Sequence, residues 1–330
     1  MEVAVKMELR NAQRRYVIDD PSKVGEARRA AHTLANFELD AASAGRAAIA
    51  ATELANNLLL HAGGGDLLIQ KLGNDDSATV ELLAIDRGRG MTDIARCMSD
   101  GFSTVGTPGT GLGAIRRLAS EFDVHSVPGE GTIVMARFGA VQELRYGAVS
   151  VALEGEVLCG DGFDLAIGPQ ELALFVIDGL GHGAFAAEAA QAGIEAFRAA
   201  PFAEPQDVMN RANASMSKTR GGAAACARLA GDKLSYSGVG NISAALVSGA
   251  RSTGLVSHNG TLGLHKRRGQ QFEYQRDPGA VLVMHTDGVS ARWDLRQNAA
   301  LLARHPAVIA AALYRDHARG RDDATVVVVG

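Results

Sequence analysis

Four aspartates in the second half of the chain, far apart in sequence, each stand at the end of a short apolar segment. They occur in the motifs Cys159-Gly160-Asp161-Gly162, Asp178-Gly179-Leu180-Gly181-His182-Gly183, Thr286-Asp287-Gly288 and Arg321-Asp322-Asp323-Ala324-Thr325. Carboxylates at the ends of buried strands repel one another and are costly to desolvate, so a positive partner is expected to offset them. A pair of hard divalent cations suits that role, because Mg²⁺ and Mn²⁺ prefer oxygen ligands. The motifs therefore predict a fold in which these strand ends meet.

The competing interpretation is that these aspartates cap turns, since Asp-Gly pairs favour tight turns. It accounts better for single positions, such as Asp164 or Asp323, than for an ordered set of motifs. We therefore expect the set as a whole to bind metal.

Length, charge and cysteine usage narrow the class of protein. A chain of 330 residues is long enough for about two ordinary domains. The net charge of −4 gives no reason to expect nucleic acid or a membrane surface as a partner. The 3 cysteines lack CxxC spacing, which argues against a disulfide framework. Residues 1–15 lack the apolar core of a signal peptide, and no segment approaches the roughly 18 apolar residues of a membrane span, so we expect a cytoplasmic protein.

The order of the predicted elements divides the chain into two domains. In the first half, the apolar periodicity predicts helices over 21–37, 41–61 and 112–120 and strands over 66–72, 79–85, 122–127 and 132–138. The pattern restarts near Tyr146, with strands over 148–153, 164–167, 172–177, 223–229, 233–239, 243–248, 280–285 and 325–329 and helices over 184–199, 205–219 and 308–317. Helices combined with antiparallel strands favour an α+β fold class. The expected domains are residues 1–139 and 146–330, joined by a linker over 140–145.

A polar helix face and glycine-rich segments in the first half point to a nucleotide. Glu53, Asn57 and His61 are spaced by four and so share one face of a predicted helix, which must meet either water or a ligand. Asp86 follows an apolar strand and precedes a glycine-rich segment, and its carboxylate can accept a hydrogen bond from an amine such as that of adenine. The segment Gly106-Thr107-Pro108-Gly109-Thr110-Gly111-Leu112-Gly113 opens a predicted helix, where backbone amides suit phosphate.

In this order, the motifs of the first half resemble the GHKL ATPase superfamily with its Bergerat α/β sandwich, and within it the anti-sigma-factor and switch-protein serine kinases (RsbT-like). The resemblance covers nearly all of residues 1–138. It implies ATP and Mg²⁺ as cofactors, with Asn57 holding Mg²⁺ and Glu53 acting as general base towards a serine hydroxyl. The nucleotide-binding residues that it implies are Asn57, Asp86, Gly88, Gly90, Gly109, Thr110, Gly111, Gly113 and Thr132.

The aspartate motifs of the second half resemble the PP2C-type phosphatases of the SpoIIE group, which have a β-sandwich flanked by helices. Phe185 and the segments 238–242 and 259–263 are similar to the RsbX-like subgroup that resets stress-response switches. The resemblance covers about 146–330 and implies two Mn²⁺ or Mg²⁺ ions, with Asp178 as the catalytic residue that bridges them. The metal-binding set that it implies is Asp161, Asp178, Gly179 through its carbonyl, Asp287, Asp322 and Asp323, with Asp323 expected behind the direct ligands.

Some features of the second half stay open. A water held between two cations can attack phosphorus in line, so no cysteine needs to be catalytic. His182 can orient the metal-binding loop or cap the following helix. Eukaryotic-type members use an amino-terminal arginine to bind the phosphate, and we find no clear equivalent, which leaves phosphate recognition unassigned.

Together the two halves predict a bifunctional regulator of a partner-switching pathway: a serine/threonine kinase fused to a metal-dependent phosphoserine/phosphothreonine phosphatase. By resemblance, the substrate is a STAS-domain anti-sigma antagonist or stressosome scaffold, and a sigma factor is a further candidate partner. Two alternatives remain open. The first half can act only as a docking module for such a partner, or ATP can be an allosteric signal for the phosphatase. Glu53 beside Asn57 favours catalysis, because nucleotide binding alone does not need a base.

Overall fold

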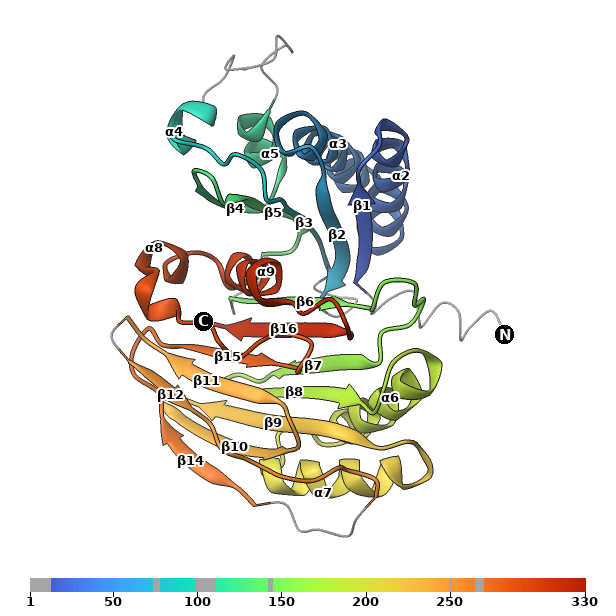
Figure 1. Ribbon diagram of the computed structural model, residues 1–330, viewed down its shortest axis with the longest axis vertical. Helices are drawn as coiled ribbons and strands as arrows, with labels where there is room; N and C mark the ends of the chain where they lie inside the picture. Colours follow the sequence, from blue (N-terminus) through green and yellow to red (C-terminus); the bar gives the residue numbers. More distant parts are fainter. Residues whose placement is uncertain (1–12, 74–77, 99–110, 142–144, 250, 265–269) are drawn as a thin grey trace. The chain divides into compact units, whose positions relative to one another are not determined.

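The protein is described by a computed structural model that covers residues 13–73, 78–98, 111–141, 145–249, 251–264 and 270–330 (Figure 1). It divides into an amino-terminal unit, Met1–Glu143, and a carboxy-terminal unit, Leu144–Gly330. The linker over 140–145 stays a prediction. No helix within the described residues is long and apolar enough to cross a membrane.

The described strands of the amino-terminal unit form one antiparallel sheet with helices on one face (Figure 1). The strand order is β1-β2-β3-β5-β4, with bounds Arg14–Ile18, Gly65–Leu72, Thr79–Ile85, Gly131–Gly139 and Glu121–Val127 in that order. The helices are α2 (Pro21–Glu38), α3 (Ala41–Asn57), α4 (Ile94–Cys97) and α5 (Leu112–Leu118). This arrangement confirms the expected α/β sandwich.

Local chemistry explains where the two long helices start and which face they bury. Asp20 accepts a hydrogen bond from the amide of Ser22 (2.8 Å), and Asp40 accepts one from the amide of Ser43 (2.7 Å), so each helix has an N-terminal cap. The buried faces of both helices are built almost wholly of alanine, which lets them approach each other and the sheet closely. The core is therefore thin, with Leu54 and Leu58 among its larger side chains.

The structure differs from the sequence prediction at several places in the first half. Strand β1 and the short helix α4 were not predicted. Two of the five residues of β1 are arginines, and among the described strands it pairs only with β2, at the edge of the sheet. The helix predicted over 41–61 ends as an α-helix at Asn57, and a π-helix runs over Leu58–Ala62. A π-helical turn is wider than an α-helical one, so His61 does not continue the i, i+4 face of Glu53 and Asn57.

A buried ion pair in this sheet supports a stability prediction. The Nε of Arg137 donates to Glu81 (2.8 Å), and both side chains are at most 1% exposed. We expect Arg137→Met to destabilise the amino-terminal unit by about 3–5 kcal/mol, because it leaves a buried carboxylate without its cation. The double variant Arg137→Met, Glu81→Leu should recover most of that loss. Chemical denaturation followed in this unit measures both, and equal losses in the single and double variants would contradict the assignment.

The described strands of the carboxy-terminal unit form two sheets with helices outside (Figure 1). One sheet has the order β13-β10-β9-β8-β7, and β14 also pairs with β10; the bounds are Ser257–His258, Lys233–Val239, Gly222–Ala230, Glu171–Gly179, Asp161–Ile167 and Phe272–Gln275. The other has the order β12-β11-β15-β16-β6, with bounds Ser252–Gly254, Ser243–Val247, Val281–His285, Ala324–Val329 and Tyr146–Val151.

Helices cover the outer face of each of these sheets (Figure 1). Helices α6 (Ala184–Arg198) and α7 (Pro205–Ser215) pack on the first sheet, where Phe197 stacks on Phe175 with ring centroids 5.6 Å apart. Helix α9 (Pro306–His317) packs on β6 and β16, and the short helix α8 (Ala299–Leu302) precedes it. The helix-flanked β-sandwich is confirmed. Strands β12, β13 and β14 and helix α8 were not predicted.

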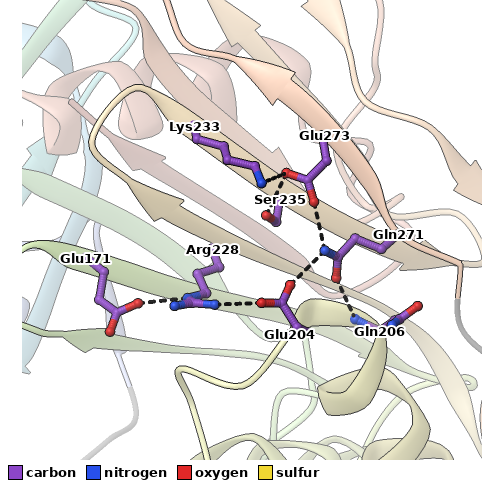
Figure 2. Close-up of polar contacts among 8 residues, drawn as sticks. All are labelled: Glu171, Glu204, Gln206, Arg228, Lys233, Ser235, Gln271 and Glu273. Carbon is purple, nitrogen blue, oxygen red and sulfur yellow. Dashed lines mark hydrogen bonds and ion pairs between the residues drawn. The ribbon is translucent and has the colours of Figure 1, made fainter.

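A surface network holds strand β14 and the start of α7 against the first sheet (Figure 2). Arg228 on β9 bridges Glu171 (2.7 Å) and Glu204 (2.9 Å), and Gln271 donates to both Glu204 (2.7 Å) and Glu273 (2.8 Å). Partly exposed pairs of this kind contribute only about 0–1 kcal/mol each. The network therefore sets the position of the edge strand more than it stabilises the fold.

Candidate functional site

The strand register of the carboxy-terminal unit brings the predicted aspartates together. Asp161 opens β7 and lies directly opposite Asp178, near the end of β8. In the other sheet, β15 ends just before Asp287, and β16 begins just after Asp322 and Asp323; these strands are antiparallel, with His285 opposite Val326. We call these five aspartates the acidic cluster.

A hydrogen bond from a threonine joins the two sheets at the acidic cluster. The hydroxyl of Thr286, just after β15, donates to Oδ2 of Asp161 on β7 (2.6 Å). The hydroxyl oxygen of Thr286 in turn accepts a hydrogen bond from the backbone amide of Thr325 (3.0 Å). Thr286 therefore fixes Asp161 relative to β15 and β16. The sequence motifs contained both threonines, but nothing in their spacing identified this role.

The carboxylates of the acidic cluster repel one another, as expected. Burial raises the pKa of Asp178 to about 7, and the charges of Asp287, Asp322 and Asp323 add to the shift. Burial also raises the pKa of Asp161 well above its usual range, with Asp178 the next cause. A folded state that holds these groups close together is under electrostatic strain unless protons or cations are bound.

The acidic cluster offers carboxylate oxygens that could hold divalent cations. Within the residues that the structure describes, no three His, Cys, Asp or Glu side chains are arranged to hold one metal ion directly. Carboxylate oxygens are nevertheless the ligands that Mg²⁺ and Mn²⁺ prefer, and Mg²⁺ usually keeps several waters while one or two carboxylates bind it. The donor set therefore suits such ions.

Asp323 anchors backbone within the acidic cluster. Its two carboxylate oxygens accept hydrogen bonds from the amides of Leu153 and Gly160, each at 2.7 Å. Leu153 and Gly160 lie near the two ends of the single loop that joins β6 to β7. Because both oxygens are engaged, the geometry favours a positioning role for Asp323 behind the direct ligands.

The loop after Asp178 can be built only with glycine at position 179. A Cβ there would lie 2.1 Å from the carbonyl oxygen of Ala186 and 2.9 Å from that of Gly160. The amide of Gly179 donates to that Gly160 carbonyl (3.0 Å), which ties the loop to the start of β7. The close packing fixes the backbone beside Asp178.

His182 orients this loop and does not cap the next helix. The N-cap of α6 is Gly183, with no side-chain cap bond, so the capping alternative for His182 is wrong. Instead Nδ1 of His182 pairs with Oε1 of Glu156 at 2.6 Å. Sequence reasoning missed Glu156, which lies between strands and carries no periodic signal. It also missed the bond from Asn241 to Oδ2 of Asp287.

Cys159 lies beside the acidic cluster but is not suited to act as a nucleophile. Burial raises the pKa of its thiol well above the usual range, with the charges of Asp161 and Asp323 as further causes. A thiol that stays protonated is a weak nucleophile. This supports the expectation that no cysteine is catalytic.

In the amino-terminal unit, α3 presents the candidate kinase residues at its carboxy-terminal end. Glu53 and Asn57 are half-buried, and their side chains form no hydrogen bond or ion pair with any other residue that the structure describes. The helix changes to a π-helix immediately after Asn57. Such π-helical turns are frequent at functional sites, because they re-aim the side chains beside them.

Asp86 organises the loops opposite this helix end. Its Oδ1 accepts hydrogen bonds from the amides of Gly88 (2.8 Å) and Thr132 (3.0 Å), which joins the end of β3 to β5. A Cβ at Gly88 would lie 2.6 Å from Cα of Ala62, at the end of the π-helix. Burial lowers the pKa of His61. The charge of Arg89 lowers this pKa further, whereas the charge of Asp86 acts to raise it. The structure therefore brings Asp86, Gly88, Thr132 and the end of the helical segment together.

The second glycine-rich segment is only partly described. Gly109 and Thr110 lie outside the described residues. Gly111 is the N-cap of α5, and Gly113 is buried in its first turn. Gly90 adopts a left-handed conformation, where a Cβ would lie 2.1 Å from the carbonyl oxygen of Val127.

Two family profiles match the chain, one in each unit. The profile described as "Histidine kinase-like ATPase domain" matches residues 17–138, and the profile "Stage II sporulation protein E (SpoIIE)" matches residues 168–330. The serine/threonine-protein kinase RsbT of Bacillus subtilis (strain 168) is 42% identical over 91 residues, which span 28% of this chain and 68% of RsbT.

Solved structures show the same folds. A chain of the bacterial stressosome, a modular system adapted to control secondary messenger signalling, aligns with a TM-score of 0.53 and 24% identity over 57% of this chain and 100% of its own. RsbX in complex with magnesium aligns with a TM-score of 0.51 and 22% identity over 64% of this chain and 100% of its own.

The profiles and the RsbT relative fall on the two units that carry the candidate sites. The chain therefore belongs to the family of RsbT-type serine/threonine kinases through its amino-terminal unit, and this unit is joined to a domain that the SpoIIE profile matches.

Proposed function

We propose that this one chain both adds phosphate to and removes it from serine or threonine residues of a STAS-domain protein in a partner-switching pathway. The kinship with RsbT supports the kinase half, and the SpoIIE-family domain supports the phosphatase half. The observation that carries the proposal is the acidic cluster, in which two sheets bring five aspartates to one place. A sigma factor is a further candidate partner.

In the kinase half, Glu53 takes the proton from the substrate hydroxyl and Asn57 holds the Mg²⁺ that accompanies ATP. Both side chains are half-buried and make no hydrogen bond within the described residues, so they are available to a ligand. Asp86 receives the adenine amine, and its fixed position follows from its bonds to Gly88 and Thr132. The glycines at 88, 90, 109, 111 and 113, with Thr110, let the backbone approach the nucleotide.

In the phosphatase half, Asp178 would be the central ligand of two Mn²⁺ or Mg²⁺ ions. The carbonyl of Gly179 and the carboxylates of Asp161, Asp287 and Asp322 would hold these ions as well, in part through water. Divalent ions held there would supply an activated water for in-line attack on phosphorus. Thr286 holds Asp161 in place, and Asp323 holds both ends of the β6–β7 loop that leads into it. The protein thus needs no covalent intermediate.

Opposed activities on one site would consume ATP without net effect. We therefore expect either different target residues for the two units or reciprocal control between them. Two other functions remain candidates: a phosphatase whose amino-terminal unit only docks a partner, and a phosphatase with ATP as an allosteric signal. Label transfer from γ-³²P-ATP to a STAS-domain protein separates them. Transfer supports the kinase, a stoichiometric complex without transfer supports docking, and a nucleotide-dependent phosphatase rate without transfer supports allostery.

The raised pKa of Asp178 predicts that metal binding depends on pH. The folded-state pKa of about 7 lies above the usual value of 3.8, so protonation favours the folded metal-free protein and its stability falls as pH rises from about 4 to 7. Metal must displace this proton, so its apparent affinity should weaken by about tenfold per pH unit below 7. Thermal unfolding with and without Mn²⁺ should show a larger rise in Tm at pH 8 than at pH 6. Equal rises at both pH values would contradict the assignment.

A further inference from the structure

The acidic cluster lacks an assigned partner for the negative charge of a phosphoryl group. Divalent ions can neutralise the carboxylates, but a phosphoserine side chain also carries about −1.5 to −2 charges at pH 7. An arginine placed beside the cluster can bind such a group with two parallel hydrogen bonds. A guanidinium held by the fold next to Asp178 would meet this need.

Arg220 occupies such a position because of the strand register. It lies just before β9, and β9 pairs with β8 so that Gly222 is opposite Gly179 and Ala223 is opposite Asp178. The amide of Leu180 donates to the carbonyl of Gly221 at 2.9 Å, which joins the Arg220 turn to the loop after Asp178. Arg220 thus comes from a distant segment to the edge of the site.

The side chain of Arg220 is held over this same loop. Its guanidinium carbon lies 4.8 Å from the ring centroid of Phe185, in a cation–π contact. Its Nη1 lies 3.3 Å from the point where a Cβ on Gly181 would sit. The guanidinium is therefore placed between the metal-binding loop and the first turn of α6.

The donors of Arg220 remain available to a ligand. The residue is exposed, and it forms no hydrogen bond or ion pair with any other residue in the described part of the chain. Other arginines of this unit, such as Arg198 and Arg228, pair with carboxylates. The ring of Phe185 engages a face of the guanidinium, which leaves the N–H groups along its edge for a phosphate.

We propose that Arg220 binds the phosphoryl group of the phosphatase substrate, with Phe185 as the positioning residue that holds its guanidinium. The inference rests on the proposed phosphatase function and fills the role that the sequence left unassigned. It predicts that Arg220 contributes mainly to substrate binding, whereas the acidic cluster contributes to the chemical step.

Steady-state kinetics of the full chain with Mn²⁺, using a phosphoserine peptide, test the proposal. Arg220→Met should raise KM by about 10- to 100-fold with a smaller change in kcat, because a charged hydrogen-bonding partner is lost. Inhibition by inorganic phosphate should weaken by a similar factor. Arg220→Lys should recover part of the loss, since the charge remains but the paired donors do not. Arg251→Met is the matched control. Arg251 directly precedes β12, which pairs with β11, and β11 ends at Val247. Val247 is opposite Val281, at the end of β15 that is far from Asp287.

The positioning role of Phe185 is tested in the same assay. Phe185→Leu should raise KM by a smaller factor, about 3- to 5-fold. Phe185→Tyr keeps an aromatic ring at this position, so its KM should stay close to that of the wild type. An unchanged KM and phosphate inhibition in Arg220→Met, with an active wild-type chain, would overturn the Arg220 assignment alone. An inactive wild-type chain would overturn the phosphatase function together with it. Circular dichroism of each variant checks that the fold is kept.

Discussion

The Asp178→Asn variant should lose phosphatase activity by at least about 100-fold. Removing a residue that only hydrogen-bonds to a metal ligand already costs up to about 100-fold, and Asp178 is itself assigned as a ligand. Asp178 lies opposite Asp161 and feels the charges of Asp287 and Asp322, which places it among the other carboxylates of the acidic cluster. Phosphate release from a phosphorylated STAS-domain protein measures the loss. Kinase activity of the same variant should stay within about twofold of wild type, because its residues lie in the other unit.

The same variant should be more stable than wild type when metal is removed. At pH 8 the buried carboxylate of Asp178 is charged and repelled by its neighbours, and asparagine removes that charge. We therefore expect a higher Tm for Asp178→Asn in EDTA, together with the loss of activity. Asp164→Asn is the matched control, since Asp164 lies on the neighbouring strand β7 but pairs with Arg198. Similar losses of activity in both variants would show that the cluster has no special role.

Glu53→Gln should reduce phosphoryl transfer from ATP by about 10²- to 10⁴-fold, the usual contribution of a general base. The substitution keeps the size of the side chain and removes only its ability to take a proton. Nucleotide binding, measured by titration with ATP and Mg²⁺, should be nearly unchanged. Asn57→Ala should weaken that binding as well, because Asn57 is assigned to Mg²⁺ and not to proton transfer.

The control for Glu53 is Glu26→Gln. Glu26 lies on α2 and pairs with Lys23 on the surface, so its loss should leave both binding and transfer unchanged. Phosphorylation that survives in Glu53→Gln would show that the general base is another group. Binding without transfer in the wild-type chain would favour the docking function for this unit.

The sequence was sufficient for elements whose residues carry their own signal. The buried strand β8 carries a continuous apolar run, and Asp-Gly pairs mark the points where the chain leaves the sheet, so the aspartate motifs could be placed on strand ends. Helices α2 and α3 begin at Pro21 and Ala41, where the apolar periodicity predicted them, and the structure adds the capping residues Asp20 and Asp40. In each case the local chemistry and the tertiary structure agree.

Other features depend on contacts that a single sequence does not contain. Strand β1 is recognisable only through its pairing with β2, because its arginines mask the β signal. The π-helix after Asn57 has no distinct sequence pattern. Glu156 acquires its role only when the loop before β7 meets His182, and Thr286 only when the two sheets are in register. The position of Arg220 likewise follows from the pairing of β8 with β9.

Titration of the metal-free chain with Mn²⁺ by calorimetry at pH 8 tests the central claim most directly, because it measures the ions and not a reaction. The account predicts two Mn²⁺ ions bound to the carboxy-terminal unit of wild type and of Asp164→Asn, with binding largely lost in Asp178→Asn. A wild-type chain that binds no Mn²⁺, or an Asp178→Asn variant that binds it as wild type does, would contradict a dinuclear site at the acidic cluster.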